Sequence, residues 1–353
     1  FAMALEIGAN HFQMTYYLGF LLLAIGIVYL IDAFKKRQLS HFFKSAAILV
    51  IAMILGISAN ATNLLATQEY TQWSTRGKSE LTVSPDGTPK ESTSGLNKEY
   101  ITEYSYGIAE SLNLFVPRLF GGSNSEKLGE DSNTYKYLVN QGVPREQAKG
   151  FSEGLPTYWG SQPIVAAPAY IGAVVVFLFV LGLFLVKGKH KRWLLAGILL
   201  SLLLSWGKNL GFVTDFMIEN FPLYNKFRAV SSIQVLLELC VPILAVLGLS
   251  ALFDASVEKK EKLKALKWGS IITAGLAILL LLGKGFFSFE GAEDAFYRQQ
   301  FNQMGLPQLM DIIVSDREKM YTIDTFRSLL FVLAAAVACY LFVFEKLKSN
   351  LAI

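Results

Sequence analysis

Long apolar runs separated by short clusters of charge are the feature that most restricts what this chain can fold into. Seven such runs occupy residues 14–31, 46–66, 166–186, 193–206, 233–253, 268–287 and 325–344. A helix needs about 20 apolar residues to cross the roughly 30 Å of hydrocarbon in a bilayer, because it rises about 1.5 Å per residue. Most of the runs are near that length. The sequence therefore predicts an all-α polytopic membrane protein with about seven transmembrane helices, and it excludes a soluble enzyme.

The fourth run, 193–206, is too short to cross a bilayer by itself. It must either continue through 207–216 or break where Gly207 precedes Lys208. A break is plausible there, because irregular backbone at membrane depth is tolerated where protein or a cavity surrounds it.

Composition agrees with a membrane protein. Hydrophobic residues make up 53% of the chain and charged residues 17%, whereas about a quarter of the residues in a soluble domain are charged. The formal net charge of +4 is too small to indicate nucleic acid as a partner. The partner that the composition does indicate is the lipid bilayer.

Basic residues follow the first, third, fifth and seventh runs. They are Lys35, Lys36, Arg37, Lys44, Lys187, Lys189, Lys191, Arg192, Lys259, Lys260, Lys262, Lys264, Lys267, Lys346 and Lys348. Every second connection is thus basic, as an alternating topology requires, and basic connections face the cytoplasm. The remaining connections, 67–165, 207–232 and 288–324, are then extracytoplasmic.

Residues 67–165 are the only segment long enough to form a domain outside the membrane. We therefore expect three parts: the first membrane helices in 1–66, an extracytoplasmic loop region in 67–165, and helices three to seven with shorter external loops in 166–353. Within the loop region, only 104–115 has apolar spacing that allows a short helix.

Residues that bind metals or nucleotides show no suitable spacing. His11, His41 and His190 are far apart, and Cys240 and Cys339 lie in apolar runs, where we expect them to be small buried hydrophobes. The chain contains no Walker A loop, no G-x-G-x-x-G and no G-x-S-x-G. Nothing in the sequence indicates a cofactor, and a divalent metal is possible without being indicated.

Four cations stand at the outer ends of the predicted spans, against the charge bias that sets the topology. They are Arg76 after the second run, and Lys208, Lys226 and Arg228 between the fourth and fifth. A phosphate group is a natural partner for such cations, since a guanidinium can bind it through two parallel hydrogen bonds. The alternative is that these side chains are loop charges in water, or extend to the interface from apolar surroundings.

Other polar or aromatic residues at the same level are candidates for substrate binding. Asn10 and His11 precede the first run, and Glu69 follows the second. Trp159 precedes the third run, where it fits either an aromatic belt at the interface or a stacking platform for a sugar ring.

Glu238 is an acid within the fifth run, which costs a few kcal/mol unless the side chain is paired or faces a cavity. Arg327, at the start of the seventh run, is the partner that we expect on geometric grounds, and the alternative is a role in a site. The acids of 288–324, including Asp294 and Asp316, show no pairing suited to glycoside-type acid–base chemistry. We expect them to be solvated.

Several short blocks together resemble the YfhO-type bacterial membrane proteins. The blocks are residues 8–17, 74–77, 158–160 with 162–163, 204–209 and 224–229. They occur over most of residues 1–250, and none of them is catalytic by itself.

The resemblance implies membership of the GT-C superfamily of polytopic glycosyltransferases. It implies transfer of a sugar from a polyprenyl-phosphate-linked donor to a cell-envelope glycan or protein, on the extracytoplasmic side of the bacterial cytoplasmic membrane. The catalytic acid of GT-C enzymes usually lies in the first external loop. Because the chain starts at Phe1 as if within a helix, we expect a fragment that lacks that loop, and we assign no catalytic residue. Arg228, Lys226, Lys208 and Arg76 would bind the donor phosphate.

Two other functions stay open from the sequence. A transporter or flippase for a lipid-linked or anionic substrate is the first, although such proteins often contain inverted repeats and paired broken helices. We find no convincing repeat and one interrupted span. The second is a non-catalytic scaffold subunit whose segment 67–165 binds a partner in the cell envelope.

Overall fold

The computed structural model describes residues 1–78, 83, 87–88 and 95–346. Parts of the loop region 67–165, and Lys348 of the last basic cluster, lie outside the described residues. Helices make up 70% of the structure, and its described residues contain no β-strand. The expected fold class, an all-α protein, is confirmed.

The chain folds as two units, each built from two separate stretches. One unit comprises Phe1–Ser105 and Lys187–Cys240, and the other comprises Tyr106–Val186 and Val241–Ile353. The division differs from the three consecutive parts expected from the sequence, because the loop region 67–165 is shared between the units. Its first part folds with the early helices and its second part with the late ones.

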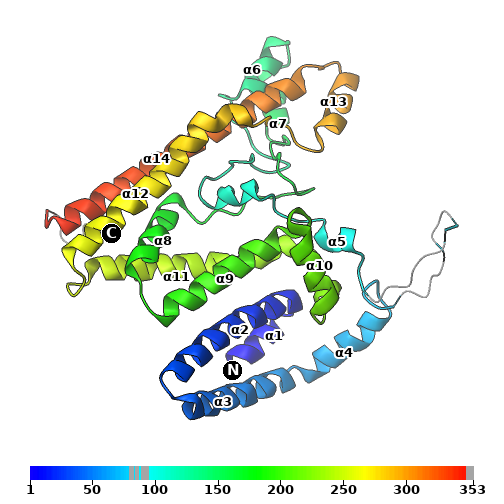
Figure 1. Ribbon diagram of the computed structural model, residues 1–353. Helices are drawn as coiled ribbons and strands as arrows, with labels where there is room; N and C mark the ends of the chain where they lie inside the picture. The colour runs from blue at the N-terminus through cyan, green and yellow to red at the C-terminus, as the bar shows by residue number, and fades with distance from the viewer. Residues whose placement is uncertain (79–82, 84–86, 89–94, 347–353) are drawn as a thin grey trace. The chain divides into compact units, whose positions relative to one another are not determined.

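The first unit is a group of helices around α2, which packs against both α3 and α9 (Figure 1). Its elements are α1 (Ala2–Gly8), α2 (Phe12–Lys35), α3 (Leu39–Ser58), α4 (Ala61–Gln72), α5 (Lys98–Thr102), α9 (Lys189–Ser205), η2 (Gly207–Leu210), α10 (Gly211–Asn220), η3 (Tyr224–Lys226) and η4 (Val230–Ile233). Gly56 lets α1 lie close to α3, since a Cβ at Gly56 would stand 2.9 Å from the Cβ of Met3.

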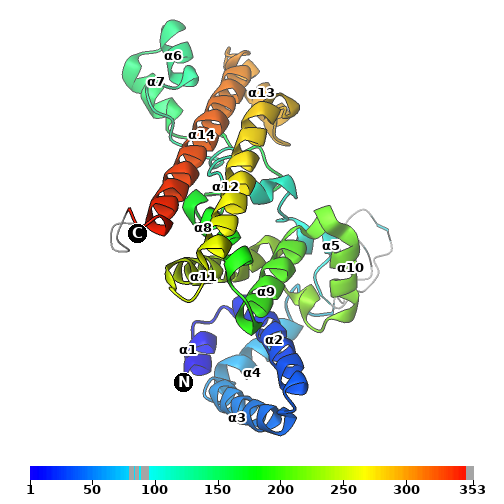
Figure 2. The same cartoon turned by 60° about the vertical axis from the view of Figure 1, so that its left-hand side comes forward.

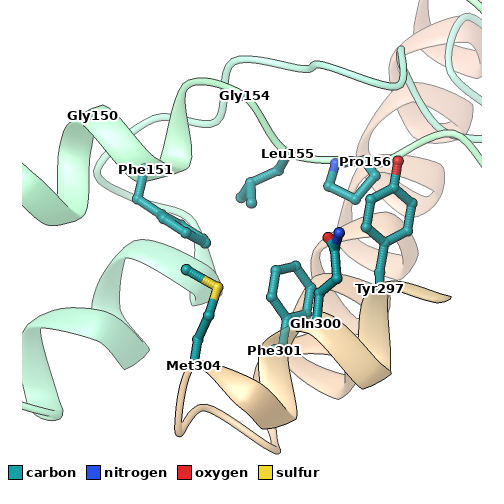
Figure 3. Close-up of a pocket in the computed structure, with 9 residues that line it drawn as sticks. All are labelled: Gly150, Phe151, Gly154, Leu155, Pro156, Tyr297, Gln300, Phe301 and Met304. Atoms are coloured by element: carbon teal, nitrogen blue, oxygen red, sulfur yellow. The ribbon is translucent and has the colours of Figure 1, made fainter. Parts of the chain in front are cut away.

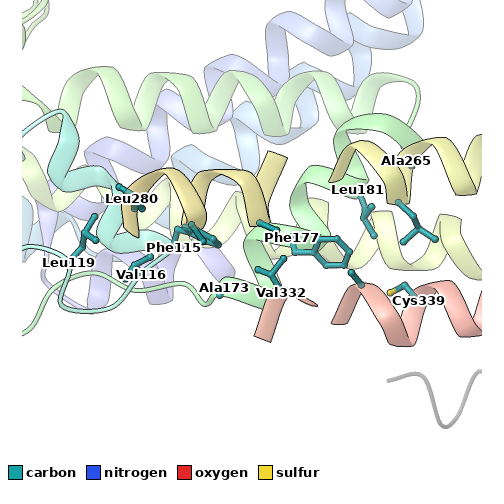
Figure 4. Close-up of a cluster of buried hydrophobic side chains, with 14 of the residues drawn as sticks. Phe115, Val116, Leu119, Ala173, Phe177, Leu181, Ala265, Leu280, Val332 and Cys339 are labelled. Carbon is teal, nitrogen blue, oxygen red and sulfur yellow. The ribbon is translucent and has the colours of Figure 1, made fainter. Parts of the chain in front are cut away.

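The second unit is organised by two long helices, α12 and α14, which run side by side (Figure 2). Its elements are η1 (Ala109–Leu114), α6 (Asn133–Asn140), α7 (Arg145–Ser152), α8 (Ala173–Leu185), α12 (Lys259–Leu282), η5 (Gly283–Phe286), α13 (Asp294–Gln303) and α14 (Leu309–Val343). Helix α11 (Gln234–Phe253) begins in the first unit and ends in the second. Phe177 and Leu181 of α8 fill the core between α12 and α14 (Figure 4).

Within the described ranges, five helices are long and apolar enough to cross a membrane. They span Phe12–Lys35, Leu39–Ser58, Val230–Phe253, Lys259–Phe286 and Leu309–Val343. Along α3, Ile48, Leu49 and Leu55 are 64–68% exposed, and apolar surface of this extent is stable in lipid but not in water. The chain is therefore a multi-pass membrane protein.

The fourth run breaks where the sequence suggested. Helix α9 ends at Ser205. The helical stretch that follows it, Gly207–Asn220, is bent from α9 by 106°. The third run differs from expectation, because α8 has only 13 residues and would extend about 20 Å. Pro168 and Gly172, which has a φ of 116°, precede α8 in a stretch that is not helical.

The second part of the loop region contains two helices, α6 and α7, that the sequence pattern did not predict. Asp316 of α14 accepts hydrogen bonds from the backbone N–H groups of Asn133 (2.7 Å) and Thr134 (2.8 Å), at the start of α6. A carboxylate stabilises a helix N-terminus by satisfying its free N–H groups. Asp316 is only 2% exposed and Asp294 only 5%, so the expectation that these two acids are solvated is wrong.

Candidate functional site

The segment between α10 and α11 carries two of the predicted cations on a strained backbone. Leu223 (φ 65°) and Ala229 (φ 57°) both adopt the left-handed conformation, although neither is glycine. Each such residue costs about 1–2 kcal/mol, and the conformation persists only where the surroundings hold it. Lys226 and Arg228 lie between these two positions. We refer to residues 221–233 as the cationic loop.

Contacts from α2 and from the stretch before α5 hold the cationic loop in place. The amide Nε2 of Gln13 donates to the carbonyl oxygen of Arg228 (2.6 Å) and to Oγ of Ser232 (3.1 Å). The backbone N–H of Leu96 donates to the carbonyl oxygen of Asn225 (3.0 Å). Tyr224 is buried, and burial raises the pKa of its hydroxyl, so it stays a neutral anchor. The loop is thus fixed through its backbone.

Arg76 and Lys226 are hydrogen bonded to each other's backbone, although they are 150 positions apart. Nε of Arg76 donates to the carbonyl oxygen of Lys226 (2.8 Å), and Nζ of Lys226 donates to the carbonyl oxygen of Arg76 (2.7 Å). Ser74 shapes the turn after α4 that presents Arg76, because its Oγ accepts from the N–H of Arg76 at 3.2 Å. Two of the four predicted cations are therefore in direct contact.

Arg228 interacts with a neutral aromatic residue of α5. Its Nη1 donates to the hydroxyl of Tyr100 at 2.5 Å, and its guanidinium carbon lies 5.1 Å from the centre of the Tyr100 ring. Among the residues that the structure describes, Arg76, Lys226 and Arg228 form no ion pair with a carboxylate. No carboxylate among the described residues therefore neutralises their positive charges. Such a cluster attracts an anion, by about 4 kcal/mol per pair of unit charges at 4 Å near a protein surface.

Lys208 is at the corner between α9 and α10, beside the cationic loop. Its backbone N–H donates to Oγ of Ser105 (3.0 Å), and its side chain is exposed. The preceding Gly207 packs on Val230 so closely that a Cβ there would lie 2.6 Å from the Cγ2 of Val230. Lys208 thus borders the cluster without joining it through a hydrogen bond among the described residues.

The three candidate substrate-binding residues from the early helices are exposed. Oδ1 of Asn10 accepts a hydrogen bond from the side chain of Asn63 at 3.2 Å. His11 directly precedes α2, but its side chain makes no capping hydrogen bond to the helix. Glu69 lies on the surface of α4. The structure connects none of these three described side chains to the cationic loop by a hydrogen bond or ion pair.

Trp159 does not form a stacking platform for a sugar. It is 8% exposed, its ring stacks on Phe120 with centroids 4.3 Å apart, and the edges of Phe287 and Phe289 cover it further. The ring is therefore a core residue of the second unit. The sequence could not show this, because Trp159 and its neighbours come from segments far apart in the chain.

Glu238 is exposed on α11. Arg327, which we expected to pair with Glu238, instead pairs with a different acid. Nη2 of Arg327 lies 3.2 Å from Oδ1 of Asp324, one turn earlier in α14. Asp324 is fully buried and also accepts two hydrogen bonds from Arg118, at 2.7 and 3.0 Å. This network was missed because Arg118 lies in the loop region, 206 positions away from Asp324.

A further buried acid, Glu110, is satisfied entirely by neutral donors. Its carboxylate accepts from the hydroxyl of Tyr158 (2.5 Å) and from the backbone N–H groups of Gly107 (3.0 Å) and Ser161 (3.2 Å). Burial, together with the nearby charge of Glu110, raises the pKa of Tyr158 above its ordinary value. At 1% exposure, Glu110 organises the fold and does not reach a substrate. The described residues contain no group of three or more His, Cys, Asp or Glu placed to hold a metal ion.

A cavity of about 400 Å³ lies between α7 and α13 in the second unit (Figure 3). Its described lining includes the apolar side chains of Phe151, Leu155, Phe301 and Met304, and its polar side chains are those of Gln300 and Tyr297. Its volume is within the range of small-molecule sites. Because no charged side chain is among its described lining residues, it offers no cation for binding a phosphate.

Comparison of the chain with protein-family models, curated proteins and solved structures finds no significant match.

Proposed function

We propose that this protein is a GT-C-like membrane glycosyltransferase of the YfhO type that binds a polyprenyl-phosphate-linked sugar donor. Arg76, Lys226 and Arg228 bind the donor phosphate, with Lys208 at the edge of the site. The observation that carries the proposal is that, among the described residues, these three cations contact carbonyl groups and a tyrosine hydroxyl but no carboxylate. A cluster that no described carboxylate compensates fits an anionic headgroup. The sequence blocks that resemble the YfhO type include all four cations.

The chemistry of transfer requires cations at this place. An acceptor hydroxyl attacks the anomeric carbon of the sugar, the bond from that carbon to the phosphate oxygen breaks, and the phosphate leaves with the bonding electrons. The proton of the acceptor passes to a base, to which we assign no residue. Negative charge grows on the departing oxygen, and prepositioned guanidinium and ammonium groups stabilise it. Because the polyprenyl chain stays in the bilayer, these groups must stand at headgroup depth.

We further propose seven membrane crossings in a bacterial cytoplasmic membrane, of which α9 and the short helix α8 form two. The basic connections would then face the cytoplasm, and the cationic loop would face outward. Acceptors in the cell envelope are reached from that side.

The proposal is tested by binding of a radiolabelled polyprenyl phosphate to the purified protein in phosphatidylcholine nanodiscs. We expect Arg228→Gln, Lys226→Gln and Arg76→Gln each to weaken binding about tenfold or more, since a hydrogen bond to a charged group contributes roughly 1.5–3 kcal/mol. Lys44→Gln removes an exposed lysine from α3 in the same unit and is the matched control.

A polyprenol without phosphate should bind equally to all variants, because it lacks the group that the cations recognise. Unchanged phosphate binding in a variant that combines Arg228→Gln, Lys226→Gln and Arg76→Gln would rule out the proposed site. Binding of the phosphate lipid without transfer from the sugar-loaded donor to any envelope acceptor would reject the transferase and favour a lipid carrier.

A further inference from the structure

Helix α10 runs almost at right angles to α9, the helix that leads into it and that we propose to cross the membrane (Figure 1). Transmembrane helices tilt on average about 20° from the membrane normal. If α9 ran along the normal, the bend of 106° would leave α10 about 16° from the membrane plane. Ten residues extend about 15 Å, which is half the thickness of the hydrocarbon. Neither its direction nor its length suits α10 to cross the bilayer.

Close packing and a hydrogen bond at Gly207 fix the corner between α9 and α10. Gly207 has a φ of 44°, and a Cβ at this position would stand 2.0 Å from Oγ of Ser105. Oγ1 of Thr214 donates to the carbonyl oxygen of Gly207 at 2.8 Å and so ties α10 back to the corner. The direction of α10 is therefore fixed by packing and hydrogen bonds within the first unit.

The two sides of α10 differ in what covers them. Thr214 and Met217 are buried on one side, whereas Phe212 and Phe216, one turn apart on the other, are 76% and 56% exposed. On that open side the last turn carries the exposed polar residue Glu219. The open side thus changes from apolar to polar along the helix.

We propose that α10 is an interfacial helix whose open side lies in the bilayer, with Phe212 and Phe216 at the boundary of the acyl chains and Glu219 among the headgroups. Helix α9, which leads into the corner, also exposes the apolar residues Leu199 and Leu203 in its last two turns. Lys208 precedes the helix in the chain and Arg228 follows it, and positive charge near the helix suits anionic headgroups. The inference depends on the membrane helices alone and not on sugar transfer.

The test is spin labelling of single cysteines in phosphatidylcholine nanodiscs free of polyprenyl phosphate. The two native cysteines, Cys240 and Cys339, are buried and are first replaced by alanine. Labels are introduced by Phe212→Cys, Phe216→Cys and Glu219→Cys, and size-exclusion profiles identify folded variants. Depth is read from accessibility to oxygen, which concentrates in lipid, and to a water-soluble nickel chelate.

We expect the labels at 212 and 216 to lie in the hydrocarbon boundary at depths that differ by less than about 3 Å, as a shallow helix requires. The label at 219 should be accessible to the nickel chelate. A label from Leu199→Cys must be deeper and is the control. Depths at 212 and 216 that differ by about 6 Å would show a helix that continues across the bilayer and would overturn the proposal.

Two further results would also overturn it. Nickel accessibility at 212 and 216 would mean a helix in water, and low accessibility to both reagents would mean a protein partner on the open side. If the variants labelled at 212 and 216 do not fold, the proposal is tested with the labels from Asn220→Cys and Glu219→Cys. Both labels must then lie at the depth of the headgroups. Loss of phosphate-lipid binding in the cationic-loop variants would leave these depths unchanged, so the two proposals fail separately.

Discussion

Arg317 and Asp294 form a two-pronged ion pair in the interior of the second unit. Nη1 of Arg317 lies 2.6 Å from Oδ2 of Asp294, and Nη2 lies 2.9 Å from Oδ1. The same guanidinium donates to the carbonyl oxygens of Phe289 (2.8 Å) and Pro156 (2.7 Å). One side chain of α14 therefore fixes both the first residue of α13 and the segment that follows α7, which are two walls of the cavity in Figure 3.

Breaking this pair from one side should be strongly destabilising, because it leaves an uncompensated buried charge. We expect Arg317→Met to lower the free energy of unfolding by about 3–5 kcal/mol, and the double variant Arg317→Met/Asp294→Leu to lose much less. Unfolding in micelles, followed by tryptophan fluorescence, measures both. Lys319→Met, which removes an exposed ion pair with Asp131, should cost at most about 1 kcal/mol. Equal costs for Arg317→Met and Lys319→Met would contradict the structural role of the pair.

Helices α8 and α11 approach closely through two glycines. A Cβ at Gly248 would stand 2.6 Å from the backbone nitrogen of Gly182, and one at Gly182 would stand 2.5 Å from the carbonyl oxygen of Leu244. Small residues drive helix packing in membranes. We expect Gly248→Ala to destabilise the second unit by about 1–3 kcal/mol, as overpacking does. Gly275→Ala in α12, where nothing lies within 4 Å of the new Cβ, should be neutral or slightly stabilising in the same assay.

The sequence could predict the parts of the fold that depend on local physics. Crossing hydrocarbon requires consecutive apolar side chains, so α2, α3, α11, α12 and α14 were visible as apolar runs. The break at Gly207 was also predictable, because a glycine followed by a lysine is a poor continuation of a membrane helix.

The remaining features depend on contacts between distant segments. Helix α6 is anchored by Asp316, and Trp159 is buried by Phe120, and neither contact leaves a periodic signal. For the candidate site, the charge bias identified Arg76 and Lys226 as unusual cations, but nothing in the sequence shows that they touch. Side-chain type is a local property, whereas proximity over 150 positions is a property of the fold.

The free energy of unfolding should fall at alkaline pH, because Tyr158 is buried in its neutral form. Burial and the negative charge of Glu110 raise the pKa of Tyr158 above the ordinary value of 10.0, whereas in the unfolded chain this tyrosine ionises at that value. Its contribution to stability is therefore complete below pH 10 and is lost as the pH rises further. We expect Tyr158→Phe to show a smaller drop in unfolding temperature between neutral and strongly alkaline pH than the unchanged protein. Tyr297→Phe is the control, and an identical alkaline drop in all three proteins would count against this assignment.

Gln13 should act on phosphate binding by positioning the cationic loop. Its Nε2 bonds to the carbonyl oxygen of Arg228 and to Ser232, so Gln13→Leu removes the link between α2 and the loop. At about 1 kcal/mol per hydrogen bond, two lost bonds correspond to roughly tenfold or greater weakening of polyprenyl-phosphate binding. Thr15 is on the same helix as Gln13, and Thr15→Val, which removes its hydrogen bond to Glu6 of α1, should leave binding unchanged.

A double-mutant cycle separates positioning from a general loss of structure. If Gln13 acts through Arg228, Gln13→Leu should add little once Arg228→Gln is present, because the side chain that it positions has already lost its charge. Fully additive effects of the two substitutions on binding would show that Gln13 acts elsewhere. A Gln13→Leu variant with unchanged affinity would show that the strained backbone at Leu223 and Ala229 holds the loop without help from α2.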